Sequence, residues 1–165
     1  MNDFLIMTKD DEELTSLKRE LTIRFEMKDM REVKRFLEMK IEHEFNDIKI
    51  HQANYIHTLL HRHEMQDCNS MNTPMDSSIK LTATTNSNAK VDSSQYQQYI
   101  GELMFAAIAT RPDIIFAVSQ LSSYNSNSCQ RHLAAAKHVL RYLKETINLD
   151  IVYKRQSTSK SPHEF

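Results

Sequence analysis

The sequence has 165 residues, with 21 Lys and Arg against 22 Asp and Glu and a formal net charge of −1. This length suffices for one compact domain, and the balanced charge excludes nucleic-acid attraction through the overall field, so that a local basic patch would be needed. The two widely separated cysteines, Cys68 and Cys129, predict a reduced, cytoplasmic protein. No apolar run reaches the roughly 20 residues of a membrane-spanning helix, so we expect no membrane partner.

The first 74 residues combine strand and helix patterns. Residues 4–7 (FLIM) form a short apolar run that predicts a buried strand. Between residues 12 and 25 the apolar side chains recur at helical spacing after an acidic first turn, which predicts a helix that packs by one face. Residues 35–51 alternate apolar and charged positions around Asn46-Asp47, a pattern typical of a β-hairpin. Helical spacing then returns at Tyr55, Ile56, Leu59 and Leu60.

The second half begins with a change of composition. Residues 75–94 are rich in Ser, Thr and Asn and predict a polar linker. Residues 95–153 contain three helical patterns, the first two separated by Pro112, and end in a short apolar run from Leu149 to Tyr153 that predicts a strand. Residues 154–165 predict a flexible tail. The expected fold class is α+β, in which a strand, helix, hairpin and helix precede a three-helix segment.

A series of short motifs runs along residues 1–153 in a fixed order. The most distinctive are TRPD at residues 110–113 and RYLK at residues 141–144. The series resembles the C-terminal part of the reverse transcriptase domain in Ty1/copia-type retrotransposon Pol polyproteins, from its catalytic Tyr-Val-Asp-Asp box onward. The other motifs that carry the resemblance are Asn2 to Ile6, Arg24 to Asp29, Phe36-Leu37, Gln52 with Tyr55, Cys68, Thr73-Pro74, Tyr96, Gly101, His132 and Thr146.

The resemblance places part of the catalytic box at the N-terminus. Asn2 falls on the first aspartate of the box and Asp3 on the second, so Asp3 is the remaining candidate catalytic residue and a vestigial Mg²⁺ ligand. In this family two adjacent carboxylates join a third from an upstream strand to hold two Mg²⁺ ions, which stabilise the attacking and leaving oxygens. A neutral amide at Asn2 does not offset the metal charge. We therefore expect this chain not to polymerise DNA.

The resemblance also implies an organisation and a setting. Residues 1–74 correspond to a partial palm and thumb-like region, and residues 95–153 to a helical, connection-like segment. The expected partners are other Pol regions and, weakly, an RNA or DNA template-primer, within virus-like particles in the cytoplasm. The alternative is a non-enzymatic nucleic-acid-binding or helical interaction module that reuses the surviving fold.

Glycine usage departs from the family. Gly101 is the only glycine, whereas average usage of about 7% predicts roughly a dozen. Charged residues occupy four positions at which the family usually has glycine, which fits a copy no longer selected for polymerase activity: Arg31, Glu38, Glu145 and Asp150.

Two further groups of residues have alternative interpretations. His57, His61, His63 and Cys68 have spacings that a zinc site could use, although a solvated helix face is favoured. Basic residues could contact a nucleic-acid backbone, but those of the N-terminal half are interleaved with carboxylates, and ordinary surface charge is favoured there and on the last predicted helix, where the positive charge is more concentrated. These are Lys18, Arg19, Arg24, Lys28, Arg31, Lys34 and Arg35 in the N-terminal half, and Arg131, Lys137, His138, Arg141 and Lys144 on the last predicted helix.

Overall fold

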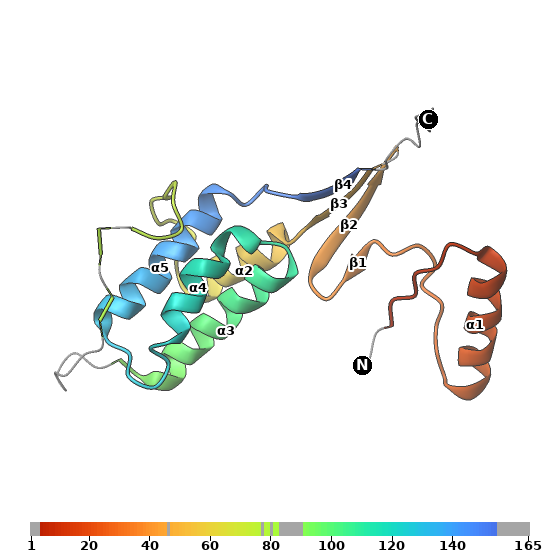
Figure 1. Cartoon of the computed structure of the whole chain (residues 1–165), viewed down its shortest axis with the longest axis horizontal. Coiled ribbons are helices and arrows are strands. Elements are labelled where there is room, and N and C mark those ends of the chain that lie inside the picture. The colour runs from red at the N-terminus through yellow and green to blue at the C-terminus, as the bar shows by residue number, and fades with distance from the viewer. Residues whose placement is uncertain (1–3, 46, 77, 80, 83–90, 155–165) are drawn as a thin grey trace, which may run out of the picture.

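The computed structural model describes residues 4–45, 47–76, 78–79, 81–82 and 91–154. Within these residues the chain forms five α-helices, a short 3₁₀ helix and one four-stranded antiparallel sheet, which confirms the predicted α+β class. Four helices gather at one end, the sheet extends from them, and the first helix stands apart beyond the sheet (Figure 1).

The four gathered helices form a single apolar core. They are α2 (Ala53–Arg62), α3 (Ser93–Ala109), α4 (Ile115–Ser122) and α5 (Gln130–Glu145). The spacing predicted all of them, because their recurring apolar residues are those that the core buries. The most deeply buried apolar side chains are Ile56, Leu59, Tyr96, Leu103, Ile114, Val118, Leu121, Val139, Leu140 and Leu143.

The core spans the segment predicted to be a linker. α2 precedes that segment and α3 to α5 follow it, yet all four contribute to the same cluster. Met75 and Leu81, inside the predicted linker, pack against this cluster, and Val91 belongs to it. Residues 83–90 of the linker and 155–165 of the predicted tail lie outside the described residues.

The helix boundaries follow from local chemistry. The carboxylate of Asp92 accepts a hydrogen bond from the Ser94 amide at 3.0 Å and so caps the start of α3. α3 ends at Ala109 with Thr110 as its C-cap, and Pro112 begins the 3₁₀ helix η2 (Pro112–Ile114), which leads directly into α4. A proline lacks an amide hydrogen and is tolerated in a first turn, so Pro112 separates α3 from α4 as predicted.

The predicted hairpin is confirmed and belongs to a larger sheet. Its strands β2 (Met39–Glu44) and β3 (Asp47–His51) pair antiparallel with Ile41 opposite Ile50. β1 (Arg35–Phe36) extends the sheet beside β2. The predicted C-terminal strand also forms, as β4 (Ile151–Lys154), and it pairs with β3 about a hundred residues earlier in the chain.

Helix α1 (Asp11–Arg24) forms where predicted, but the expectation that it packs by one face is wrong. Asp10 caps the helix, and acidic residues occupy its first turn. None of its residues is buried, and the Ile23 side chain is 77% exposed. The described part of the chain places no other helix or strand beside α1 (Figure 1). Its apolar stripe is therefore at most partly buried: Leu14 and Leu21 are intermediate, whereas Leu17 and Phe25 are exposed.

The buried strand predicted for residues 4–7 is also wrong. These residues form neither helix nor strand, and the Phe4 and Met7 side chains are 69% and 86% exposed. A strand forms when a neighbour satisfies its backbone hydrogen-bonding groups. No described strand pairs with this segment, so apolar composition alone does not produce the strand.

Several turns use left-handed backbone conformations without glycine. Arg31, Leu37, Glu38, Phe45 and Glu64 have φ angles of 63°, 45°, 62°, 50° and 54°. Arg31 and Glu38 are two of the four charged residues at positions where glycine was expected, and both adopt the conformation that favours glycine. The other two positions, in the last turn of α5 and just before β4, have negative φ angles.

No helix among the described residues has both the length and the apolar character needed to cross a bilayer.

Candidate functional site

The candidate catalytic residues Asn2 and Asp3 lie outside the described residues, so their arrangement remains a prediction. The next residues along the chain, from Phe4 to Met7, form neither helix nor strand and are largely exposed. Among the described residues, no group of three or more His, Cys, Asp or Glu side chains is placed to hold a metal ion.

The three histidines near α2 do not share one environment. His57 and His61 are exposed, as a solvated helix face requires. His63 departs from that expectation, because its ring stacks on Tyr99 with the centroids 3.7 Å apart. Its Nε2 atom also lies 2.6 Å from Oε2 of Glu102. His63 therefore joins α2 to α3.

Glu102 is the acceptor at the centre of this contact. Besides His63, it receives hydrogen bonds from Arg62 and from Gln98 one turn earlier on α3. Burial acts to raise the pKa of Glu102, but these donors outweigh it and hold the pKa below its ordinary value. Glu102 thus stays ionised and ties the end of α2 to α3.

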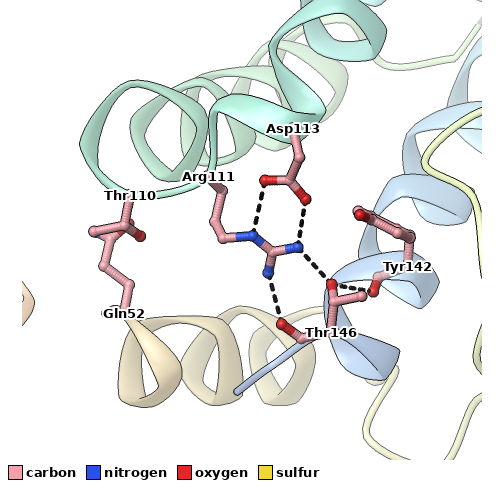
Figure 2. A network of polar contacts seen from close by, with 6 residues as sticks. All are labelled: Gln52, Thr110, Arg111, Asp113, Tyr142 and Thr146. Carbon is pink, nitrogen blue, oxygen red and sulfur yellow. Dashed lines mark hydrogen bonds and ion pairs between the residues drawn. The ribbon is translucent and has the colours of Figure 1, made fainter. Parts of the chain in front are cut away.

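The TRPD motif forms a second polar network (Figure 2). The Arg111 side chain is only 1% exposed, and its Nε and Nη2 atoms donate to the two carboxylate oxygens of Asp113 at 3.0 and 2.7 Å. Its Nη1 atom donates to the Thr146 carbonyl at 3.0 Å, and Nη2 also contacts the Thr146 hydroxyl. The guanidinium carbon lies 5.6 Å from the centre of the Tyr142 ring. Arg111 therefore joins the end of α3 to the end of α5.

The charges of this network are matched. Burial acts to raise the pKa of Asp113, but the hydrogen bonds and positive charge of Arg111 outweigh it and lower that pKa overall. Burial raises the pKa of the neighbouring Tyr142, and the Asp113 carboxylate raises it further. The ion pair and its neutral phenol therefore keep their protonation states near neutral pH.

A neutral hydrogen bond lies next to the buried arginine. The hydroxyl of Thr110 donates to Oε1 of Gln52 at 2.9 Å, and both side chains are buried (Figure 2). Gln52 precedes the first residue of α2, so this bond connects the start of α2 with the end of α3. The Gln52 Nε2 atom is buried without a hydrogen-bond partner.

The basic residues of α5 hold a loop in place. Arg141 donates from Nε to the Asn69 carbonyl, and Lys144 donates from Nζ to the Cys68 carbonyl at 2.7 Å. His138 donates to the Thr73 carbonyl at 2.9 Å. These three surface residues therefore contact the loop, a role that the sequence did not predict. Their spacing along the helix matches a row of carbonyl acceptors.

At the start of α5, His132 forms a buried cluster. Its Nδ1 atom accepts a hydrogen bond from the Cys129 amide at 3.1 Å, and its ring stacks on Tyr124 with the centroids 4.0 Å apart. The Nε2 atom donates to the Thr82 carbonyl at 3.2 Å, while the Tyr124 hydroxyl donates to Leu81. Burial lowers the pKa of His132, so the imidazole is neutral near pH 7. The cluster holds residues 81–82 against α5.

Comparison with known proteins identifies the family. Residues 1–77 match the family described as reverse transcriptase (RNA-dependent DNA polymerase). The retrovirus-related Pol polyprotein from transposon TNT 1-94 of Nicotiana tabacum is 33% identical over 153 residues, which cover 88% of this chain. The chain belongs to the Ty1/copia-type Pol polyproteins. It is a fragment of their reverse transcriptase region.

Other relatives of this Pol fragment extend across nearly the whole chain. The Pol polyprotein from transposon RE1 of Arabidopsis thaliana is 34% identical over 96% of the chain, and a transposon Ty5-1 protein of Saccharomyces cerevisiae is 33% identical over 95%. The fragment spans 12% and 11% of the tobacco and Arabidopsis polyproteins and 51% of the yeast protein. No solved structure matches the chain.

The structure gives the motifs of the Pol fragment a physical role. TRPD, RYLK, His132 and Thr146 place hydrogen-bonding groups where segments distant in the sequence meet in the helical core. Sequence reasoning identified these residues by resemblance alone. It missed Glu102, which belongs to none of the motifs; the one available signal was a carboxylate near Gly101 within an otherwise neutral helix.

Proposed function

We propose that this Pol fragment is a non-polymerising part of a reverse transcriptase. The helical unit, formed by α2 to α5, acts as a scaffold. The N-terminal segment, residues 4–35, docks onto the remainder of the palm. In this proposal residues 4–51 correspond to the palm edge and the thumb-proximal hairpin, and residues 53–154 to the thumb-like and connection-like helices. The observation that carries the proposal is the exposed apolar surface of the N-terminal segment, which has no partner within the described residues.

The candidate metal ligands of this chain do not suffice for two-metal catalysis. Mg²⁺ prefers anionic oxygens, and two-metal polymerase sites gather several of them. The positions assigned to the box offer one carboxylate, Asp3, beside the neutral amide of Asn2. These residues do not fit a pair of Mg²⁺ ions, and we derive no catalytic step through them.

The apolar surface of the N-terminal segment favours a protein partner. Its exposed side chains lie on the residues before α1, on α1 itself and on the loop that follows it. Fully burying one such side chain stabilises a complex by about 1.5–3 kcal/mol, so a few suffice for specific docking. They are Phe4, Leu5, Met7, Leu17, Ile23, Phe25 and Met30.

Charge argues against nucleic acid as the main partner of this surface. Residues 4–35 contain eight Lys or Arg and eight Asp or Glu. Lys18 is paired with Asp29 at 3.2 Å. A segment without net charge releases few counterions from a phosphate backbone, so nucleic-acid binding through it would be weak.

A primer-extension assay tests the inactivity. The purified chain and its Asn2→Asp variant are incubated with oligo(dT) annealed to poly(A) RNA, dTTP and Mg²⁺. We expect no extension by either protein, because Asn2→Asp restores the pair of aspartates but supplies no third carboxylate for a two-metal site. Mg²⁺-dependent extension by the wild-type chain would overturn the proposal that it is inactive.

A binding assay tests the docking. The partner is the reverse transcriptase segment that precedes the matched region in the Arabidopsis RE1 relative, expressed separately and titrated with this chain. We expect Ile23→Ser to weaken binding at least tenfold. Ile108→Ser is the matched control, since Ile108 is 74% exposed on α3 and Ile23 is 77% exposed on α1. Equal loss in both variants, or no binding, would exclude α1 as the docking surface.

The nucleic-acid-binding alternative has a separate test. An RNA–DNA hybrid that shifts in mobility with this chain at low salt, and loses the shift on Lys18→Gln with Arg19→Gln, would favour direct binding by the N-terminal segment. An unchanged mobility is the outcome expected from the balanced charge.

A further inference from the structure

A shallow, open surface cavity of about 590 Å³ lies on the exposed side of α2. It is lined by two imidazoles, from His57 and His61, together with Thr58 and Arg62. The two histidines are four residues apart in one helix, so their side chains lie one above the other on the same face. Neither takes part in the polar networks that hold the helical core together.

We propose that His57 and His61 chelate a divalent transition-metal ion, of the class of Zn²⁺, Ni²⁺ or Cu²⁺. Neutral imidazole nitrogens are suitable ligands for these ions, and histidines at this spacing on a helix are a known way to present two of them. The remaining coordination positions face the open cavity and are filled by water or by a side chain from a partner. The metal site does not depend on the proposed scaffold and docking functions.

The position of the pair on α2 favours a cation. His61 lies in the last turn of the helix, where the backbone carbonyls carry partial negative charge. The neighbouring Arg62 would otherwise oppose a bound cation, but it forms an ion pair with Glu102. The positive charge beside the cavity is therefore balanced within the helical unit.

The same contacts disfavour a phosphate group as the ligand. An anion site requires positive charge, and the Arg62 guanidinium that lines the cavity already has Glu102 as its partner. Neutral imidazoles provide hydrogen bonds but no net charge. A metal ion uses those lone pairs directly, so the chemistry of the lining suits a metal better than an anion.

The site differs from the zinc arrangement considered from the sequence. His63 is engaged with Glu102 and Tyr99, and the partly buried Cys68 side chain packs against the hydrophobic core. The described residues bring no third His, Cys, Asp or Glu to the pair. The proposed site is thus an open, two-ligand surface site, in contrast to a closed structural zinc site.

Calorimetric titration of the full chain with ZnCl₂ in phosphate-free buffer tests the proposal. We expect one Zn²⁺ ion per chain to bind at these histidines, with affinity reduced at least tenfold by His57→Gln and equally by His61→Gln. His43→Gln is the matched control, because His43 is also exposed and is the only histidine of β2, where its Nε2 atom lies 3.8 Å from a Glu32 carboxylate oxygen. Both ligand positions are on the solvated side of α2, and circular dichroism checks that each variant remains folded.

A second measurement gives an independent readout. Zn²⁺ should raise the thermal midpoint of the wild-type chain and of His43→Gln, because an ion that binds the folded state and not the unfolded state stabilises the folded state. It should not raise the midpoint of His57→Gln or His61→Gln. Binding that survives both ligand substitutions would place the metal elsewhere and overturn the proposal. So would an absence of Zn²⁺ binding to the wild-type chain.

Discussion

The guanidinium of Arg111 lies against the carboxylate of Asp113, two residues further along the chain, with two hydrogen bonds of 3.0 and 2.7 Å. The arginine is almost fully buried, whereas the Asp113 side chain is 32% exposed. The pair therefore lies where η2 meets the end of α5, with the carboxylate partly open to water (Figure 2). This geometry makes the TRPD motif a stability element of the helical unit.

Arg111→Gln should destabilise the chain by about 3 kcal/mol, because it removes the charge partner of Asp113 and the donors to Thr146. Urea unfolding followed by circular dichroism measures the change. Arg131→Gln, on the exposed side of α5, should alter the free energy of unfolding by less than about 0.5 kcal/mol. Similar effects of the two substitutions would mean that the Arg111 network contributes little.

The Asp113 carboxylate should make stability depend on acidic pH. Its pKa is lowered in the folded chain below the ordinary value of 3.8, so the unfolded chain binds a proton more readily. The stabilisation is complete above that value and is lost as the pH falls through the folded pKa. The gap in unfolding free energy between wild type and Asp113→Asn should therefore be full at about pH 6 and smaller at about pH 3. A gap that stays constant would show that the shift is absent.

The cations of α5 should control the exposure of residues 68–73. Lys144→Met and Arg141→Met each remove a side-chain donor to a loop carbonyl. Amide hydrogen exchange of Met71, whose N–H donates to the Arg141 carbonyl at 3.3 Å, should accelerate by about tenfold in each variant. Lys137→Met, also on α5 but exposed, should leave the exchange unchanged. Unaltered exchange in the first two variants would show that the loop is held by its apolar contacts alone.

The helical core could be predicted because its signals are local. Leu133, Ala136, Leu140 and Leu143 recur at helical spacing, and all four are buried. The hairpin at residues 35–51 was likewise predicted from alternation. The pairing of β4 with β3 could not be, since it depends on how α2 to α5 bring Ile151 beside Ile50.

The predictions that were wrong concern residues whose environment depends on a partner distant in the sequence. α1 and residues 4–7 have the apolar patterns of packed elements, but a pattern does not reveal whether a partner is present. The charges of α5 were visible, whereas their carbonyl acceptors around residues 68–73 lie about seventy residues earlier in the chain. The geometry of Asn2 and Asp3 remains a prediction.

Substitution by glycine should have opposite effects on stability at Glu38 and Glu145, two positions at which the family usually has glycine. Glu38 has a φ angle of 62° in the two-residue turn between β1 and β2, where a side chain is strained and glycine is not. Relief of this strain exceeds the cost of the larger conformational entropy that glycine gives the unfolded chain. Glu38→Gly should therefore stabilise the chain by about 0.5–1 kcal/mol. Glu145→Gly should destabilise it by up to about 1 kcal/mol, because Glu145 is a helical residue of α5.

Urea unfolding of the two variants and the wild type measures this contrast. If both substitutions destabilise the chain, the left-handed turn at Glu38 carries no strain that glycine can relieve. If both stabilise it, the gain would come from loss of negative charge, and Glu38→Gln would reproduce it. The expected result, a gain at Glu38 only, would show that replacing glycine has cost this reverse-transcriptase fragment stability at the turn while leaving its fold intact.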